Sequence, residues 1–254
     1  MVPRPANPLQ RPSPLRRPTP LASTPIPTPS TTNVSNPQAL QTGEKPFLGL
    51  PADLFSYFCD YSYKTAIERQ ADQKYLQSGF QIVPAANINE IALFKNDTLR
   101  VLVFAYRGTV MEKADGVADL AIAKGTFRGS QRWRFSLNHT YKYQAYFPSY
   151  RLIFTGHSLG GKIAEEMYLY FEQKDSVRCL GYVAFAPGSS PLESFQLQQS
   201  VGPDYEKQAF VVRGDPVPAA YRMRAAGRIR KVRMIAAHPH SLNNYTKTRL
   251  GALT

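Results

Sequence analysis

Cysteine is almost absent from the sequence, whose 254 residues contain only Cys59 and Cys179. The two lie far apart and form no Cys-x-x-Cys pair, so the sequence excludes a disulfide framework and a cysteine-based structural zinc site. The free energy that holds the fold together must therefore come from an apolar core.

Long apolar runs are absent as well. No segment is long enough to cross a bilayer as a helix, and the stretch that begins at Met1 lacks the apolar centre of a signal peptide. We therefore expect no signal peptide, no transmembrane segment and a cytoplasmic location. Peripheral association with membranes and association with a virion are the alternatives.

The sequence is also poor in acidic residues. It contains 18 Asp and Glu against 31 Lys and Arg, which gives a net charge of +13 and a pI of about 9.8. Such a charge attracts anionic partners, among them phospholipid surfaces, nucleic acids and acidic proteins. A basic cluster late in the chain consists of Arg222, Arg224, Arg228, Arg230, Lys231 and Arg233. This basic cluster predicts either contact with anionic phospholipid or an ordinary solvated surface, and charge alone does not choose between them.

The N-terminal part of the chain differs in composition from the rest. Residues 1–46 contain 12 of the 21 prolines and show no apolar periodicity. This predicts a disordered, Pro-rich, basic tail, followed by one domain over residues 47–254. Such segments bind SH3-like domains or nucleic acid, but no aromatic side chain precedes Phe47 to stack on bases. Nucleic acid is therefore the less favoured partner, and an unstructured spacer is the preferred interpretation of the tail.

Segments with the apolar spacing of strands alternate with segments that have the spacing of helices. We expect helices over residues 52–77, 131–147 and 162–171, and a short helix with a loop over 110–130. We expect strands over residues 91–94, 101–106, 152–155, 177–185, 209–212 and, more weakly, 230–235, the first two forming a hairpin with a tight turn at Asn96-Asp97. This alternation predicts a single α/β domain with a mostly parallel sheet flanked by helices.

Residues 156–160 read Gly156-His157-Ser158-Leu159-Gly160, a Gly-x-Ser-x-Gly pentapeptide. By chance it occurs in about one chain in ten of this length. Here a predicted strand precedes the serine, a predicted helix follows it, and the two glycines permit the sharp turn that holds a serine hydroxyl above a sheet. The context predicts an α/β-hydrolase fold with Ser158 as the nucleophile. The alternative is a glycine-rich turn that binds a phosphate at a helix N-terminus.

A serine nucleophile requires a general base, usually a histidine oriented by a carboxylate. The sequence contains the histidines His139, His157, His238 and His240. In α/β-hydrolases the acid and then the histidine follow the serine, which leaves His238 and His240 as candidates and makes His157 the variable residue of the elbow. Asp204 and Asp215 are the candidate acids, and Asp215 is preferred because it follows a predicted strand.

No metal site and no organic cofactor are predicted. His238 and His240 lie only two positions apart, as a pair of metal ligands does, but the sequence places no third ligand near them. Hydrolysis by a serine, a histidine and an aspartate requires no cofactor.

Several segments together resemble a known family, the class 3 lipases, typified by fungal triacylglycerol lipases. The segments are Phe104–Thr109, Asp115–Leu120, Phe154–Gly161, Ala184–Gly188, Gly214–Pro218 and His240–Tyr245. They occur in the family's order, and the resemblance runs from residue 52 to residue 247. One departure is the segment Val110–Asp115, which lacks the aromatic anchor expected of the family's lid.

The resemblance implies a role for each site residue. Ser158 is the nucleophile, Asp215 the acid and His240 the base, with His238 as a competing base. The backbone N–H groups of Thr109 and Leu159 form the oxyanion hole.

The sequence as a whole therefore predicts a serine carboxylester hydrolase that acts on lipid esters through an acyl-enzyme, at a membrane or lipid surface. The resemblance favours an acylglycerol substrate, whereas the net charge of +13 favours a phospholipid. The alternative function is a non-enzymatic binding protein or virion-associated protein on a degenerate hydrolase fold, whose basic tail binds nucleic acid or a membrane.

Overall fold

The computed structural model describes residues 49–109, 126–173, 178–188, 207–212, 215, 228–232 and 240–245. The predicted tail over residues 1–46 lies outside these residues. So does most of the predicted helix and loop between residues 110 and 130, of which residues 126–130 are described, with a 3-10 turn over Phe127–Gly129.

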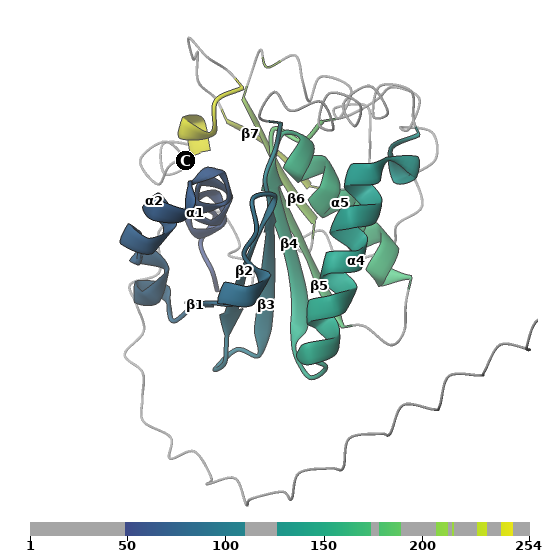
Figure 1. Cartoon of the computed structure of the whole chain (residues 1–254). Coiled ribbons are helices and arrows are strands. Elements are labelled where there is room, and N and C mark those ends of the chain that lie inside the picture. Colours follow the sequence, from purple (N-terminus) through teal and green to yellow (C-terminus); the bar gives the residue numbers. More distant parts are fainter. Residues whose placement is uncertain are drawn as a thin grey trace, which may run out of the picture. The chain divides into compact units, whose positions relative to one another are not determined.

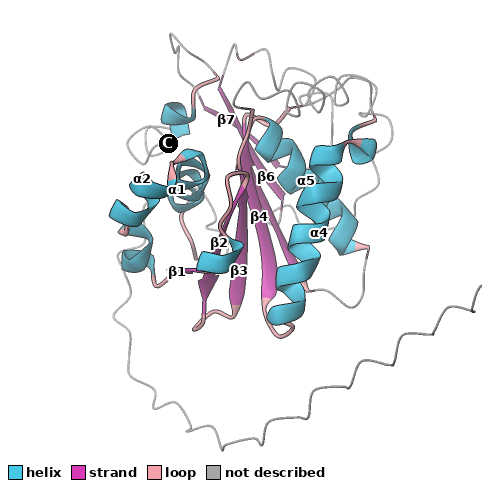
Figure 2. Ribbon diagram, in the orientation of Figure 1, coloured by secondary structure: helices cyan, strands magenta, loops and turns pink. Residues whose placement is uncertain are grey.

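A seven-stranded sheet forms the centre of the described part (Figures 1 and 2). Its strands are β1 (Gln81–Ile82), β2 (Ile91–Asn96), β3 (Val101–Tyr106), β4 (Arg151–His157), β5 (Cys179–Phe185), β6 (Lys207–Val212) and β7 (Arg228–Val232). They lie in the sheet in the order of the sequence. β1, β2 and β3 pair antiparallel, and β3 to β7 pair parallel. The predicted α/β fold with a mostly parallel sheet is therefore confirmed.

Strands β2 to β5 are almost wholly buried on both faces, which is why the parallel strands among them have nearly continuous apolar sequences. All six residues of β3 are buried. Val101, Val103 and Ala105 pack in the apolar cluster on one face, while Leu102, Phe104 and Tyr106 pack in the cluster on the other. Successive side chains of a strand point to opposite faces, so a single uninterrupted run supplies both halves of the core.

Helices cover the two faces of the sheet. They are α1 (Ala52–Tyr63), α2 (Ala66–Ala71), α4 (Gln131–Tyr146) and α5 (Leu159–Glu172). α1 and α2 lie on one face, and α4 and α5 lie on the other (Figure 1). None of the described helices is both long enough and apolar enough to pass through a bilayer.

The single helix predicted over residues 52–77 is wrong, because three short helical segments occupy this range. α1 ends at Tyr63, α2 follows, and a 3-10 turn spans Lys74–Ser78. The break is caused by a capping box, in which the Thr65 side chain accepts a hydrogen bond from the Glu68 amide and the Glu68 carboxylate accepts one from the Thr65 amide. A capping box starts a new helix, so the chain changes direction after α1.

The predicted hairpin is present, but its connection is longer than a tight two-residue turn. Asn96 is paired with Val101, so residues 97–100 form the loop. The Asn96 Oδ1 atom accepts a hydrogen bond from the Leu99 amide at 2.9 Å, and Arg100 has a positive φ of 49°. The asparagine side chain therefore stabilises a wider loop than the sequence suggested.

A cluster of charged side chains lies along the first turns of α5, and all of its members except Arg128 are buried. The Lys162 side chain is fully buried, and its Nζ atom lies 2.7 Å from Glu166 Oε1 and 3.3 Å from Glu165 Oε2. Arg128 Nε contacts the other oxygen of Glu166 at 2.7 Å. Burial raises the pKa of Glu166, but the attraction of Lys162 and Arg128 outweighs it and holds this pKa below its ordinary value. The helix that follows Ser158 is thus held by ion pairs in which each buried charge has an opposite charge beside it.

Candidate active site

Ser158 lies on a sharp turn between β4 and α5. Its φ of 57° and ψ of −123° are uncommon for a residue with a side chain, and backbone hydrogen bonds hold it there. The Ser158 amide donates to the Phe185 carbonyl at 3.0 Å, and the Ser158 carbonyl accepts from the amides of Lys162 and Gly188 at 3.1 and 3.2 Å. The turn has the strand, serine and helix arrangement of a nucleophile elbow.

The two glycines of the pentapeptide lie where no side chain fits. A Cβ atom on Gly156 would lie 2.2 Å from the carbonyl group of Gly160, and a Cβ on Gly160 would lie 2.0 Å from the carbonyl oxygen of Tyr106. The start of α5 therefore packs directly on the carboxyl ends of β3 and β4. This close approach brings the Ser158 hydroxyl to the edge of the sheet.

Ser158, His240 and Asp215 form a continuous hydrogen-bonded chain. The Ser158 Oγ atom lies 2.9 Å from His240 Nε2. The His240 Nδ1 atom lies 2.9 Å from Asp215 Oδ2 and 3.2 Å from Oδ1. A proton on Nδ1 leaves the Nε2 lone pair directed at the serine hydroxyl, which is the arrangement of a general base.

Asp215 follows β6, and only 2% of it is exposed. A buried carboxylate that accepts a hydrogen bond from His240 fixes the tautomer of that ring. The structure thus brings together the nucleophile, the acid and one of the two bases that the sequence nominated. The competing base His238 and the other candidate acid, Asp204, lie outside the described residues.

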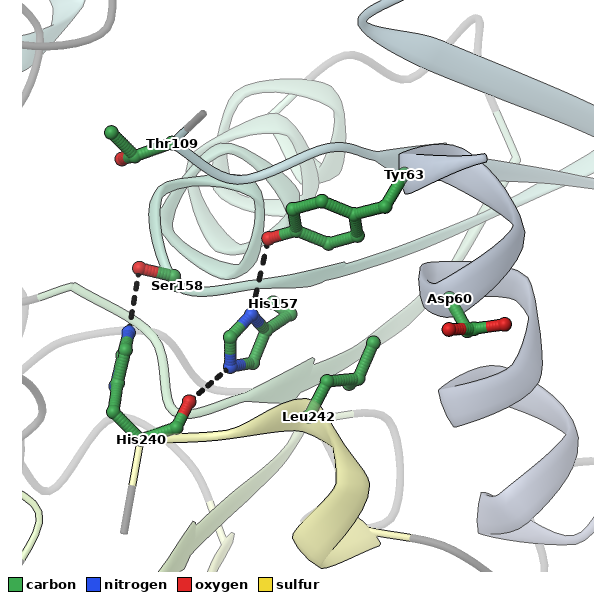
Figure 3. Close-up of a pocket in the computed structure, with 7 residues that line it drawn as sticks. All are labelled: Asp60, Tyr63, Thr109, His157, Ser158, His240 and Leu242. Atoms are coloured by element: carbon green, nitrogen blue, oxygen red, sulfur yellow. Dashed lines mark hydrogen bonds between the residues drawn. The ribbon is translucent and has the colours of Figure 1, made fainter. Parts of the chain in front are cut away.

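The two predicted oxyanion donors belong to the start of α5 and to the segment after β3. Leu159 is the first residue of α5, and the amide at this position has no acceptor within its own helix. Thr109 lies just beyond β3 and lines the same cavity as Ser158 (Figure 3). The segment before Thr109 is held by hydrogen bonds on two sides. The Arg107 amide donates to the Glu90 carbonyl at 2.9 Å, and Arg132 donates to the Arg107 carbonyl at 3.0 Å.

Two further polar side chains adjoin the nucleophile, and the sequence analysis gave neither of them a role. His157 Nε2 lies 2.8 Å from the main-chain carbonyl oxygen of His240, and His157 Nδ1 lies 3.1 Å from the Tyr63 hydroxyl (Figure 3). The Gly108 amide donates to that hydroxyl at 3.0 Å. Burial, followed by the proximity of His240, lowers the pKa of His157 to about 4. No sequence signal marks Tyr63, which is 94 residues from His157.

The cavity at Ser158 has a volume of about 250 Å³. Its lining residues among those described are Asp60, Tyr63, Thr109, His157, Ser158, His240 and Leu242. Leu242 is the one aliphatic side chain in this set. The Asp60 carboxylate, which pairs with Lys64 at 2.8 Å, adds a negative charge to the lining. Most of these residues carry a polar group, but the surface that they present to the cavity is largely apolar, and the cavity has room for the reacting ester group.

Residues 101–224 match the sequence profile of the lipase (class 3) family, which confirms the resemblance predicted from the motifs. No curated protein sequence matches the chain at a significant level.

Three solved structures illustrate the structural similarity. The triacylglyceride lipase of Rhizomucor miehei is 16% identical, with a TM-score of 0.49 over 71% of this chain and 78% of that one. A lipase of Rhizopus microsporus var. chinensis is 10% identical, with a TM-score of 0.48 over 79% and 84%. A lipase of Yarrowia lipolytica is 13% identical, with a TM-score of 0.47 over 76% and 80%.

Proposed function

We propose that this chain, whose residues 101–224 match the class 3 lipase profile, is a carboxylester hydrolase that hydrolyses lipid esters through Ser158, His240 and Asp215. The observation that carries the proposal is the chain of hydrogen bonds from Ser158 Oγ through both nitrogens of His240 to the Asp215 carboxylate, with distances of 2.9 Å at each step.

The reaction proceeds in two halves. His240 Nε2 takes the Ser158 proton as Oγ attacks the ester carbonyl, and the same proton then passes to the departing alcohol. A water molecule, deprotonated by His240, next attacks the acyl-enzyme, the bond between the acyl carbon and Ser158 Oγ breaks, and the proton passes from His240 to Oγ as the fatty acid is released. Asp215 stabilises the imidazolium that forms in each half. Each backbone donor, Thr109 N–H and Leu159 N–H, stabilises the oxyanion by about 3 kcal/mol in the transition state.

Two classes of lipid ester suit the site. An acylglycerol is the substrate that the family favours. A phospholipid is the second candidate, because the net charge of +13 attracts the chain to anionic membranes, where each basic residue near the surface contributes about 1 kcal/mol. In both cases the chain works as a peripheral protein at a lipid surface.

Turnover assays test the proposal. The purified protein is offered p-nitrophenyl esters with short and long acyl chains, then triacylglycerol emulsions and anionic phospholipid vesicles. Ser158→Ala should abolish turnover of every substrate, and Ser78→Ala, at an exposed position away from the site, should keep it. Absence of turnover by the unmodified protein, or equal turnover by Ser158→Ala, would contradict the proposal and favour the non-enzymatic alternative.

A further inference from the structure

We propose that Tyr63 and His157 are positioning residues, which connect the oxyanion segment to the backbone of the catalytic base through one directed chain of hydrogen bonds. This inference rests on the proposed function, and it assigns neither side chain a contact with the ester. Figure 3 shows the chain, with Tyr63 reaching from α1 toward His157, and His157 reaching toward the backbone of His240.

The direction of every hydrogen bond in this chain is determined. The His240 carbonyl oxygen can only accept, so His157 Nε2 carries the proton and donates to it at 2.8 Å. In the neutral ring His157 Nδ1 is then an acceptor, so the Tyr63 hydroxyl donates to it at 3.1 Å. The Tyr63 oxygen in turn accepts from the Gly108 amide at 3.0 Å. None of these hydrogen bonds can exchange its donor and acceptor without the loss of a bond in the chain.

One end of the chain holds the oxyanion segment. Gly108 directly precedes Thr109, whose amide is a proposed oxyanion donor. A Cβ atom on Gly108 would lie 2.2 Å from the Tyr63 hydroxyl oxygen and 3.2 Å from Ser158 Cβ. The segment is thus packed against both the Tyr63 side chain and Ser158. By binding the Gly108 amide, the Tyr63 hydroxyl fixes the position of the Thr109 amide, which is directed at the substrate.

The other end holds the catalytic base. The main-chain carbonyl of His240 is bound by His157, while the imidazole of His240 reaches Ser158 Oγ at 2.9 Å. A rotation of this backbone would swing Nε2 away from the serine. His157 directly precedes Ser158 in the chain. The residue that binds the backbone of the base is therefore the neighbour of the nucleophile in the same elbow.

His157 must also be uncharged for this role. Its ring centroid lies 5.0 Å from that of His240, which becomes positively charged during each half of the reaction. A second positive charge at this distance would oppose that step. Only 7% of His157 is exposed, and burial keeps its ring neutral. A neutral imidazole supplies one donor and one acceptor and adds no charge.

Three substitutions test separately the two hydrogen bonds that His157 makes. His157→Gln keeps an N–H near the Nε2 position and loses the acceptor at Nδ1. His157→Asn keeps an acceptor near Nδ1 and loses the donor to His240. Tyr63→Phe removes the hydroxyl that joins His157 to Gly108. The matched controls are Tyr57→Phe, on the same helix with its hydroxyl on Asp72 at 2.8 Å, and His139→Gln, whose Nε2 lies 2.9 Å from the Ala86 carbonyl oxygen.

The variants are compared by their kcat and KM on a soluble p-nitrophenyl ester and by the rate at which a fluorophosphonate labels Ser158. Loss of the donor to His240 misplaces the base, and a misplacement of about 1 Å costs on the order of 10²-fold in rate. We expect His157→Asn to lose kcat and labelling rate by that factor with KM unchanged. His157→Gln should stay within about tenfold of the unmodified protein, and Tyr63→Phe should lose about tenfold, as one hydrogen bond to the segment is removed. Both controls should keep full kcat.

The inference is overturned if His157→Asn and Tyr63→Phe keep the unmodified kcat while remaining folded. It is also overturned if His157→Gln and His157→Asn lose kcat equally and in proportion to a fall in their unfolding temperature, since that is the result of a purely structural role. Failure of the proposed function looks different, because the unmodified protein would then turn over no ester and Ser158 would not be labelled.

Discussion

Gly160 packs so closely on Tyr106 that a Cβ atom on the glycine would lie 2.0 Å from the carbonyl oxygen of the tyrosine. The helix after the nucleophile and the strand before the oxyanion segment thus touch through their backbones. The separation of this helix and this strand sets the distance between Ser158 and Thr109. It can be this small only because Gly160 has no side chain.

Gly160→Ala should therefore lower both stability and activity. Overpacking of a core costs about 1–3 kcal/mol or more, and here the obstacle is a backbone that cannot rotate away. The measurements are the unfolding temperature and kcat on a soluble ester. Gly129→Ala is the control, because a Cβ there has no neighbour within 4 Å. Equal behaviour of the two variants would show that the close approach does not matter.

Asp215→Asn should reduce kcat on the order of 10⁴-fold while the protein stays folded. The asparagine amide can donate to His240 Nδ1, which would leave the proton on Nε2 and remove the base from Ser158. Steady-state kinetics on a p-nitrophenyl ester and a circular dichroism spectrum check this prediction. A modest loss of a few fold would argue that Asp215 is not the acid.

His240→Ala should remove ester turnover, whereas His238→Ala should keep most of it. His240 Nε2 lies 2.9 Å from the serine hydroxyl, and a residue two positions away on the same chain cannot occupy that place at the same time. Kinetics of the two variants on the same soluble ester decide between the candidate bases. A larger loss in His238→Ala would assign the base to His238.

The stability of the protein should fall in mild acid because of His157. Its pKa is about 4 in the folded protein against an ordinary value of 6.5, so below pH 6.5 the unfolded chain binds a proton that the folded protein does not. The contribution of His157 is fully present above pH 6.5 and is lost as the pH falls to 4, by an amount on the order of 3 kcal/mol. Urea unfolding at several pH values measures this slope. His157→Gln should show a shallower slope between pH 4 and 6.5, and an unchanged slope would contradict the assignment.

Lys162→Met should destabilise the domain by about 3–5 kcal/mol, because it leaves Glu165 and Glu166 without the cation buried beside them. Chemical denaturation at neutral pH measures the loss. Lys142→Met, at an exposed position on α4, should change the free energy of unfolding by less than about 0.5 kcal/mol. Similar effects of the two substitutions would refute a special role for the buried lysine.

Much of the sheet could be predicted from the sequence, because strands buried on both faces have uninterrupted apolar runs. Val101–Tyr106 was predicted to the residue. The helix break at Thr65 could have been found, since Thr65 and Glu68 have the spacing of a capping box. The roles of Tyr63 and His157 could not be predicted in this way. Their contact joins α1 to the elbow across 94 residues, and it exists only after the sheet has brought both elements to one edge.

The order of the strands in the sheet has a consequence for folding during synthesis of the chain. Each strand is added beside the one made before it, so the sheet can grow in one direction while the ribosome is still at work. Ser158 is then in place before the chain that carries Asp215 and His240 has been synthesised. Docking of Tyr245, which is fully buried and packs on Phe185 with ring centroids 5.1 Å apart, completes the site. A nascent chain is therefore expected to be folded in large part before the hydrogen-bonded set of Ser158, His240 and Asp215 is complete.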